Sequence, residues 1–231
     1  MYTSRCPDHP FPRTMMDVQS GPGKAGRPAA KPKATKADIS RERVLLAAAQ
    51  IFAEMGYAGT TMRAVAERVG LRAASLYYHY RSKEDLVEAV LATGTGSIAA
   101  SVQQALAQLP ANTSARERIE SALAAHLGSI ISLGDFARAT RRVLAQLPAP
   151  LRRKHVALRD AYSDLWLGLL ESARDNQELC EGVDTHLART FILGALNSAA
   201  DWYKPGAKSL PEIAAQLVLV TRGIFRSNAA H

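Results

Sequence analysis

Residues 61–83, with the sequence TMRAVAERVGLRAASLYYHYRSK, combine small side chains and polar donors in a spacing that suits contact with a DNA duplex. Small residues at the start of a helix let its backbone approach base edges in the major groove. An arginine there reaches guanine O6 and N7 or a phosphate, and a serine donates or accepts a hydrogen bond. The segment therefore predicts a helix-turn-helix whose second helix reads bases through Arg72, Ala73, Ala74 and Ser75.

Side chains that donate hydrogen bonds to phosphates surround this helix. Three polar-tipped aromatic residues follow its first turn, and core packing alone explains them poorly because Leu76 is already the inward anchor and Tyr80 packs beside it. Thr61 and Lys83 lie where flanking helices begin, and the backbone N–H groups of helix N-termini also favour a phosphate. Arg63 lies one turn into the helix that precedes the reading helix. The predicted phosphate contacts are Thr61, Arg63, Tyr77, Tyr78, His79 and Lys83.

The positive charge of the chain is confined to its N-terminal third. The formal net charge is +8, and residues 1–83 hold 14 Lys and Arg against 6 Asp and Glu, whereas residues 84–231 hold 15 against 15. Charge of one sign in one region indicates a polyanionic partner, and a neutral remainder argues against a protein that merely coats nucleic acid. A solvated basic tail is the alternative explanation.

Residues 1–36 contain six prolines, scattered glycines and no periodic apolar pattern, so we expect this basic tail to be disordered. Within it, Gly26-Arg27-Pro28 resembles the AT-hook, in which an extended arginine lies in a narrow minor groove. The alternative is an unspecific tail that only adds phosphate contacts. Met15 and Met16 leave open whether translation starts at Met1 or downstream.

Apolar periodicity predicts the helices that position the DNA-reading segment. A stripe at three- and four-residue spacing predicts a first helix, which Gly56 ends. Thr60 and Thr61 cap the next helix, Gly70 supplies the tight turn, and Ser82 begins a longer helix with a sequence like a capping box. The predicted helices cover residues 39–56, 62–69, 73–79 and about 83–107.

The rest of the chain predicts five further helices and no strand. Ser114 and Glu117 form a capping box, and Pro148 and Pro150 interrupt the apolar pattern between two helices. These helices cover residues 114–132, 135–147, 151–174, 184–203 and 210–227. The sequence thus predicts an all-α protein with a disordered tail (1–36), a helix-turn-helix DNA-binding domain (37–83) and a ligand-binding and dimerisation domain (84–231).

The stretch from about Ile39 to Ala92 resembles the DNA-binding head of the TetR family of repressors. The residues that carry the resemblance are Phe52, Gly56, Thr60-Thr61, Val65-Ala66, Gly70 and above all Ser75-Leu76-Tyr77-Tyr78-His79-Tyr80-x-x-Lys83. The resemblance implies a homodimer whose three N-terminal helices bind a palindromic operator in double-stranded DNA. About six C-terminal helices then form an effector pocket, and effector binding releases the repressor. The base and phosphate contacts given above are those that the family's pattern assigns.

The resemblance also implies that the last two long helices pair with their copies in a four-helix bundle. Their apolar faces supply the predicted dimer interface. Its residues are Phe191, Gly194, Ala195, Trp202, Ile213, Leu217, Val220 and Ile224. Burial of the same faces in the core of a single chain is the alternative, and the two interpretations are compatible.

Residues 191–214 are similar to a branch of TetR-family regulators that includes repressors of fatty-acid and steroid catabolism, which sense acyl-CoA thioesters. Such an effector needs an apolar slot and cations for its phosphates. The predicted ligand residues are Arg138, Arg141, Trp166, Leu170 and Asn197. Solvated helix faces explain the arginines equally well, and core packing explains Trp166 and Leu170. A hydrophobic drug sensed by an efflux regulator is the competing effector, and an architectural DNA-binding protein without any effector is a further alternative.

Nothing in the chain indicates an enzyme, a cofactor or a metal site. Gly-x-Ser-x-Gly, P-loop and dinucleotide-binding glycine patterns are absent. The histidines, among them His126, His155 and His186, have no neighbouring His or Cys at metal-ligand spacing. Two cysteines, Cys6 and Cys180, cannot form a disulfide framework, and no apolar run approaches the roughly 18 residues of a membrane span. We therefore expect a cytosolic protein, and the family resemblance implies a bacterial one.

Overall fold

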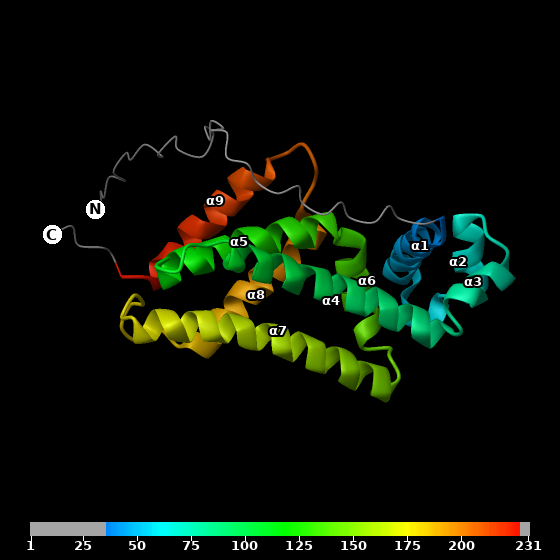
Figure 1. The fold of residues 1–231 in the computed structure, drawn as a ribbon, viewed down its shortest axis with the longest axis horizontal. Coiled ribbons are helices and arrows are strands. Elements are labelled where there is room, and N and C mark those ends of the chain that lie inside the picture. Colours follow the sequence, from blue (N-terminus) through cyan, green and yellow to red (C-terminus); the bar gives the residue numbers. More distant parts are fainter. Residues whose placement is uncertain (1–35, 227–231) are drawn as a thin grey trace, which may run out of the picture. The chain divides into compact units, whose positions relative to one another are not determined.

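The computed structural model describes the secondary structure of residues 36–226 and the side chains of residues 41–226. This range is helical, with a single isolated bridge as its strand-like pairing, so the all-α prediction is confirmed (Figure 1). Its elements are α1 (Lys36–Gly59), α2 (Met62–Val69), α3 (Ala73–His79), α4 (Lys83–Ala107), α5 (Ala115–Ser132), α6 (Gly134–Leu144), α7 (Ala149–Asp175), α8 (Thr185–Trp202), α9 (Leu210–Thr221) and the 3-10 helix η1 (Arg222–Ile224). The predicted basic tail lies outside the described residues except for Lys36, and so do its Gly26-Arg27-Pro28 motif, Cys6 and the alternative start methionines.

Gly56 ends the regular part of the first helix, as the sequence predicts. Its φ of 71° and ψ of −177° interrupt the helical backbone inside α1, and one further turn follows. A Cβ at this position would lie 2.8 Å from the side-chain amide of Gln146, so that side chain would have to move if Gly56 were replaced. The Thr60 hydroxyl closes the break by donating to the Gly56 carbonyl at 2.7 Å.

The helix-turn-helix forms through local interactions that its sequence specifies. Thr61 caps α2, because its hydroxyl accepts a hydrogen bond from the Ala64 N–H at 3.1 Å. Gly70 ends α2 in the left-handed conformation, with a φ of 74°, which glycine adopts without strain. Leu76 is fully buried and anchors α3 to the core of the head.

The apolar core around α1, α2 and α3 also takes in residues from the start of α4 and from α6. The contributing side chains are Leu86, Val87, Val90 and Leu91 of α4 and Phe136, Ala139 and Val143 of α6. α6 therefore packs directly against α1. α4 continues from this core alongside α5 and α7 (Figure 1). The head thus shares its core with two helices beyond residue 83, where the predicted DNA-binding domain ends.

The last helix is shorter than the sequence predicts. α9 ends at Thr221, η1 follows, and Phe225 is extended and buried in the body core instead of continuing a helix to residue 227. Phe225 pairs with Leu179, and the Cys180 N–H donates to the Ile224 carbonyl at 2.9 Å. The periodic pattern did not reveal this turn, because burial of one aromatic ring against distant residues causes it.

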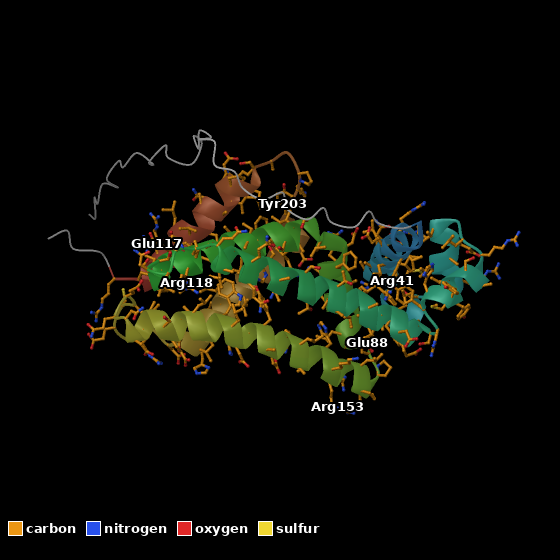
Figure 2. The ribbon with its side chains drawn as sticks, viewed as in Figure 1. Arg41, Glu88, Glu117, Arg118, Arg153 and Tyr203 are labelled. Carbon is orange, nitrogen blue, oxygen red and sulfur yellow. The ribbon has the colours of Figure 1, made fainter. Side chains whose placement is uncertain are left out.

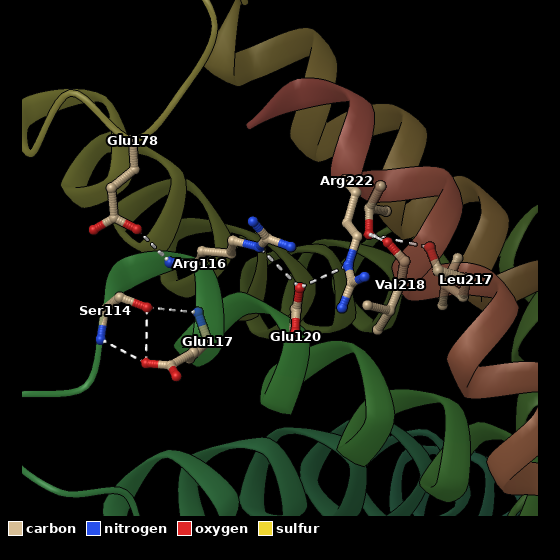
Figure 3. A network of polar contacts seen from close by, with 9 residues as sticks. Ser114, Arg116, Glu117, Glu120, Glu178, Leu217, Val218 and Arg222 are labelled. Atoms are coloured by element: carbon tan, nitrogen blue, oxygen red, sulfur yellow. Dashed lines mark hydrogen bonds and ion pairs between the residues drawn. The ribbon is translucent and has the colours of Figure 1, made fainter. Parts of the chain in front are cut away.

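Polar contacts attach this C-terminal segment to the start of α5 (Figure 3). Ser114 and Glu117 form the predicted capping box. The Glu178 carboxylate accepts hydrogen bonds from the Ala115 and Arg116 N–H groups at 2.9 and 2.8 Å, which places a negative charge where a helix N-terminus favours it. Arg116 and Arg222 both pair with Glu120, at 3.1 and 3.5 Å. These contacts fix one end of the helical body.

Candidate DNA-binding surface and ligand cavity

The first turn of α3 presents the four predicted base-reading residues to solvent. Arg72, Ala73, Ala74 and Ser75 are all exposed, and Arg72 makes no capping hydrogen bond with its side chain. Leu76 points the opposite way into the core. A helix whose outer side carries small residues and an exposed guanidinium has the shape and chemistry that a major groove accepts.

The aromatic residues that follow are exposed to different degrees. Tyr78 is 86% exposed and Tyr77 is 50% exposed, whereas Tyr80 is 4% exposed and belongs to the head core. His79 is half-buried, with its ring edge-on to Tyr78 at 5.5 Å between centroids. Neither Tyr77 nor Tyr78 belongs to the buried core of the head. Their phenolic hydroxyls are available to phosphates.

The flanking residues of this surface also have structural roles within the chain. Thr61 is exposed and caps α2, and Arg63 pairs with Glu67 at 2.8 Å on the outer side of α2. The Lys83 ammonium donates to the Tyr57 carbonyl at 3.0 Å and lies 4.3 Å from the centre of the Tyr57 ring. Lys83 therefore links the end of α1 to the start of α4 in the chain without DNA.

A cavity of about 510 Å³ lies in the body between α4, α5, α6, α7 and α8. Of the five predicted ligand residues, Arg141 and Asn197 line it. Arg138 lines a separate hollow of about 340 Å³ beside α1 and the end of α8. Trp166 and Leu170 are fully buried in the body core and do not line either space. The structure thus brings two of the five predicted residues together.

Sequence reasoning missed most of the polar residues in the cavity walls. They are Thr95, His126, Thr140, His155, Arg159, Asp160, Tyr162, Ser163, Arg189 and Thr190. His126 contacts Tyr162 across 36 positions of sequence, with 2.8 Å between its Nδ1 and the tyrosine oxygen. One signal was present: His155 and Tyr162 are seven residues apart, which places them on one face of a helix. That spacing does not reveal His126, which contacts Tyr162 from another helix.

The cations of the cavity differ in their pairing. Arg141 is bound to Asp201 and to the Asn197 carbonyl, and Arg159 lies 3.9 Å from Asp160. Arg189 is half-buried and has no hydrogen-bond or ion-pair partner among residues 41–226. A partly desolvated guanidinium without a counter-ion favours an anionic ligand. By contrast, Arg153 extends into solvent from α7, and the neighbouring Lys154 pairs with Glu88 (Figure 2).

His126 should make the stability of the protein depend on pH on the acid side. Burial lowers the pKa of His126 to about 4, and the nearby Asn197 side chain opposes this only in part. The unfolded chain therefore binds the proton at higher pH than the folded chain does. The stabilisation of the folded state that comes from keeping His126 neutral is complete above about pH 6.5. It is lost as the pH falls toward 4.

We expect this group to remove about 2 kcal/mol from the free energy of unfolding between pH 6.5 and 5, since one pKa unit corresponds to about 1.4 kcal/mol. Urea denaturation of the wild type and of His126→Leu across this range measures the difference. Parallel pH profiles of the two proteins would show that His126 titrates in the folded state as it does in the unfolded state.

The predicted dimer residues fall into two groups. Phe191, Gly194, Ala195 and Trp202 of α8 are exposed, and with Leu187 they form a stripe along the helix. On α9, Val220 is 77% exposed and Leu219 beside it is 46% exposed. Ile213, Leu217 and Ile224 are instead half-buried and pack against the body core. Assignment of these residues to a dimer interface remains a prediction.

Within the described range, no helix has both the length and the apolar character of a membrane-spanning segment. No group of three potential metal ligands occurs among the same residues.

Two family models match the chain. The model described as bacterial regulatory proteins, tetR family, matches residues 44–90, which contain the helix-turn-helix. The model described as tetracyclin repressor-like, C-terminal domain, matches residues 112–224. Together they cover most of α1 to α3 and the body from α5 to α9.

Known proteins with similar sequences or folds include the following three. The HTH-type transcriptional repressor KstR2 of Rhodococcus jostii (strain RHA1) is 26% identical over 167 residues, which are 72% of this chain and 80% of the relative. The structure of the ketosteroid transcriptional regulator KstR2 of Mycobacterium tuberculosis superposes with a TM-score of 0.72 at 23% identity, covering 81% of this chain and 95% of that chain. AibR, solved in complex with isovaleryl coenzyme A and operator DNA, superposes with a TM-score of 0.67 at 22% identity, covering 80% of this chain and all of that chain.

Proposed function

The chain belongs to the TetR family of bacterial regulators, and we propose that it is a repressor that an acyl-CoA thioester releases from its operator. It binds a palindromic operator as a homodimer, with α3 of each protomer in a major groove. The observation that carries the DNA half is the exposed first turn of α3, held by the fully buried Leu76. The aromatic residues after that turn supply phosphate donors.

The guanidinium of Arg189 in the cavity wall, which has no partner among residues 41–226, supports an anionic effector. An acyl-CoA combines phosphates with an acyl group, and the cavity combines Arg141, Arg159 and Arg189 with apolar walls that include Ile98 and Leu193. The fold is shared with AibR, which was solved with isovaleryl coenzyme A and operator DNA. A flat hydrophobic drug would supply no anion to pair with Arg189.

Helix α6 is suited to carry the effect of the ligand to the head. Its Arg141 lines the cavity and binds Asp201 of α8, while Phe136, Ala139 and Val143 on its other side belong to the head core that includes α1. Polar contacts reinforce this coupling: Gln50 donates to Asp135 at 3.2 Å, and the Ala58 N–H donates to Gln146 at 3.1 Å. A ligand anion that competes with Asp201 for Arg141 would favour another position of α6 and change the spacing of the two heads.

The exposed stripe of α8 supports the homodimer. Leu187, Phe191 and Trp202 are each more than half exposed although they are large and apolar. Gly194 lies in the same stripe, and a Cβ there would have no neighbour within 4 Å. Its lack of a side chain lets a second helix approach closely. Such a patch on a single chain indicates an interface.

Binding of a fluorescent operator duplex tests the proposal. The duplex is taken from the upstream region of the protein's own gene, and its anisotropy is followed with and without added acyl-CoA. Palindrome-specific binding that an acyl-CoA reverses is the expected result. Binding without sequence preference would indicate an architectural protein instead, and release only by hydrophobic drugs would indicate a sensor of efflux substrates.

Arg72→Ala and Lys83→Ala should separate base reading from phosphate binding. Arg72→Ala should change which base is preferred at one operator position, at a cost of about 1–3 kcal/mol for the cognate base. Lys83→Ala should weaken binding to all sequences about equally. It should also reduce the slope of log affinity against log salt concentration by about one. Competition titrations with single-base operator variants at several salt concentrations distinguish the two. Equal loss on every duplex with Arg72→Ala would place Arg72 on a phosphate.

A further inference from the structure

We propose that Arg41 of α1 is a further phosphate-binding residue of the head, and that Tyr80 positions its guanidinium for the DNA backbone. This inference rests on the proposed function, because it concerns the operator that the head binds. It adds a contact outside residues 61–83, so that the phosphate-binding surface extends to the N-terminal part of α1.

The Arg41 side chain lies against the residue that ends the DNA-reading helix. Its Nε donates a hydrogen bond to the Tyr80 hydroxyl at 3.3 Å, and its guanidinium carbon lies 5.6 Å from the centre of the Tyr80 ring. Tyr80 is 4% exposed and is the residue at which α3 ends. A ring that is fixed in the head core therefore restrains a cation that is 39 positions away in sequence.

The contact with Tyr80 leaves most of the guanidinium available to a ligand. An arginine carries several N–H donors, and Tyr80 accepts only the one on Nε. Arg41 is exposed, and its terminal nitrogens have no hydrogen-bond or ion-pair partner among residues 41–226. These nitrogens form the edge of a guanidinium that binds phosphate oxygens in a bidentate manner.

Arg68 of α2 shows how an arginine is held when it only joins two helices of the head. Its terminal nitrogens donate to the two carboxylate oxygens of Glu54 on α1, at 3.3 and 2.9 Å. That pairing cancels the charge of Arg68. Tyr80 is a neutral phenol, so it restricts the motion of Arg41 and leaves the positive charge of Arg41 intact. A restrained cation of this kind loses little conformational freedom when it binds a phosphate.

Lys83, which the family resemblance assigns to a phosphate, is held in the same manner. Its ammonium lies 4.3 Å from the centre of the ring of Tyr57, which also belongs to the head core. Tyr80 stands in the chain between the predicted phosphate contacts His79 and Lys83. Because charged phosphates follow one another closely along a DNA strand, a cation held by Tyr80 lies within reach of a phosphate near those two contacts.

Methylphosphonate scanning of the operator duplex tests this inference with the full-length protein. Each modified duplex, taken from the upstream region of the protein's own gene, lacks the charge of one phosphate, and fluorescence anisotropy measures its affinity. We expect one position in each half-site where the modification weakens binding of the wild type about fivefold or more. The same modification should have no further effect on Arg41→Ala, because the two changes remove the same contact.

Salt titrations separate the charge of Arg41 from its positioning by Tyr80. Arg41→Ala should bind operator and scrambled duplexes about tenfold more weakly, and the slope of log affinity against log salt concentration should fall by about one for each arginine removed. Arg41→Lys retains the charge and should restore most of that slope. Tyr80→Phe retains both ring and charge, so it should keep the slope and lose about threefold in affinity, because the guanidinium is then ordered only on binding.

Arg43→Ala is the matched control. Arg43 is exposed on the same helix, and positions two apart on a helix do not share a face. The substitution removes the same charge, and it should leave the methylphosphonate profile of the wild type unchanged. The thermal midpoint of Arg41→Ala should change little, because Arg41 is exposed.

The possible outcomes are distinct. A methylphosphonate profile that Arg41→Ala leaves unchanged, or one that Arg43→Ala alters in the same way, would overturn the inference and leave the proposed function standing. A salt slope that Arg41→Ala does not lower would likewise overturn it. Failure of the wild type to bind either the operator or the scrambled duplex would count against the DNA-binding function itself, and the inference would fall with it.

Discussion

Replacing Trp166 with alanine is expected to lower the free energy of unfolding by about 3–5 kcal/mol. Trp166 is 0% exposed and lies in the body core with Leu123, Leu170 and Leu196. Removal of a fully buried indole loses its transfer free energy and leaves a cavity that close-packed neighbours fill only in part. Urea denaturation followed by circular dichroism measures the change.

A milder pair of variants separates a core role from a ligand role for Trp166. Trp166→Phe should destabilise the protein yet leave acyl-CoA affinity within about threefold of the wild type. Arg189→Ala should do the reverse, since its half-buried cation lacks a partner among residues 41–226. We expect about a tenfold loss of affinity with little change in stability. Loss of ligand binding in a stable Trp166→Phe protein would return Trp166 to the ligand site.

Replacing both Tyr77 and Tyr78 with phenylalanine is expected to weaken operator binding by about a thousandfold. A dimer loses four hydroxyls in this variant, and a hydrogen bond of this kind contributes about 1 kcal/mol, more when the acceptor is charged. About 4 kcal/mol corresponds to roughly three powers of ten in affinity. The thermal midpoint should not change, because both rings are at least half exposed.

Fluorescence anisotropy with the operator duplex checks this expectation, and Tyr203→Phe is the matched control. Tyr203 lies at the C-terminal end of α8, away from α3, and its hydroxyl should not affect DNA affinity. An unchanged affinity in the Tyr77 and Tyr78 double variant would show that these rings face something other than phosphate. A lower thermal midpoint would show that they support the head.

The head illustrates which features follow from local sequence. Thr61, Gly70 and Leu76 act over a few residues: a hydroxyl caps the nearest N–H groups, a glycine adopts a positive φ, and one apolar side chain points inward. The bounds of α2 and α3 agree with the sequence prediction for this reason. The Ser114 and Glu117 capping box places the start of α5 in the same way.

The cavity illustrates what long-range contacts decide. Periodicity placed Trp166 and Leu170 on the inward face of a helix, but an inward face serves equally well as core or as cavity wall. Only the neighbouring helices distinguish the two. His126 has no neighbouring His or Cys at metal-ligand spacing in the sequence, and its contact with Tyr162, 36 positions away, forms only in the folded chain.

The sequence by itself thus determined the helix-turn-helix, because spacing and side-chain type within residues 61–83 are sufficient to build and expose it. Only the tertiary structure decided that the DNA-reading head shares its core with α6, and that Arg189 and His126 line the same cavity. The physical reason is the distance along the chain over which each interaction acts. Caps and turns are satisfied by neighbours along the chain, whereas desolvation and the pairing of buried polar groups depend on helices that only folding brings together.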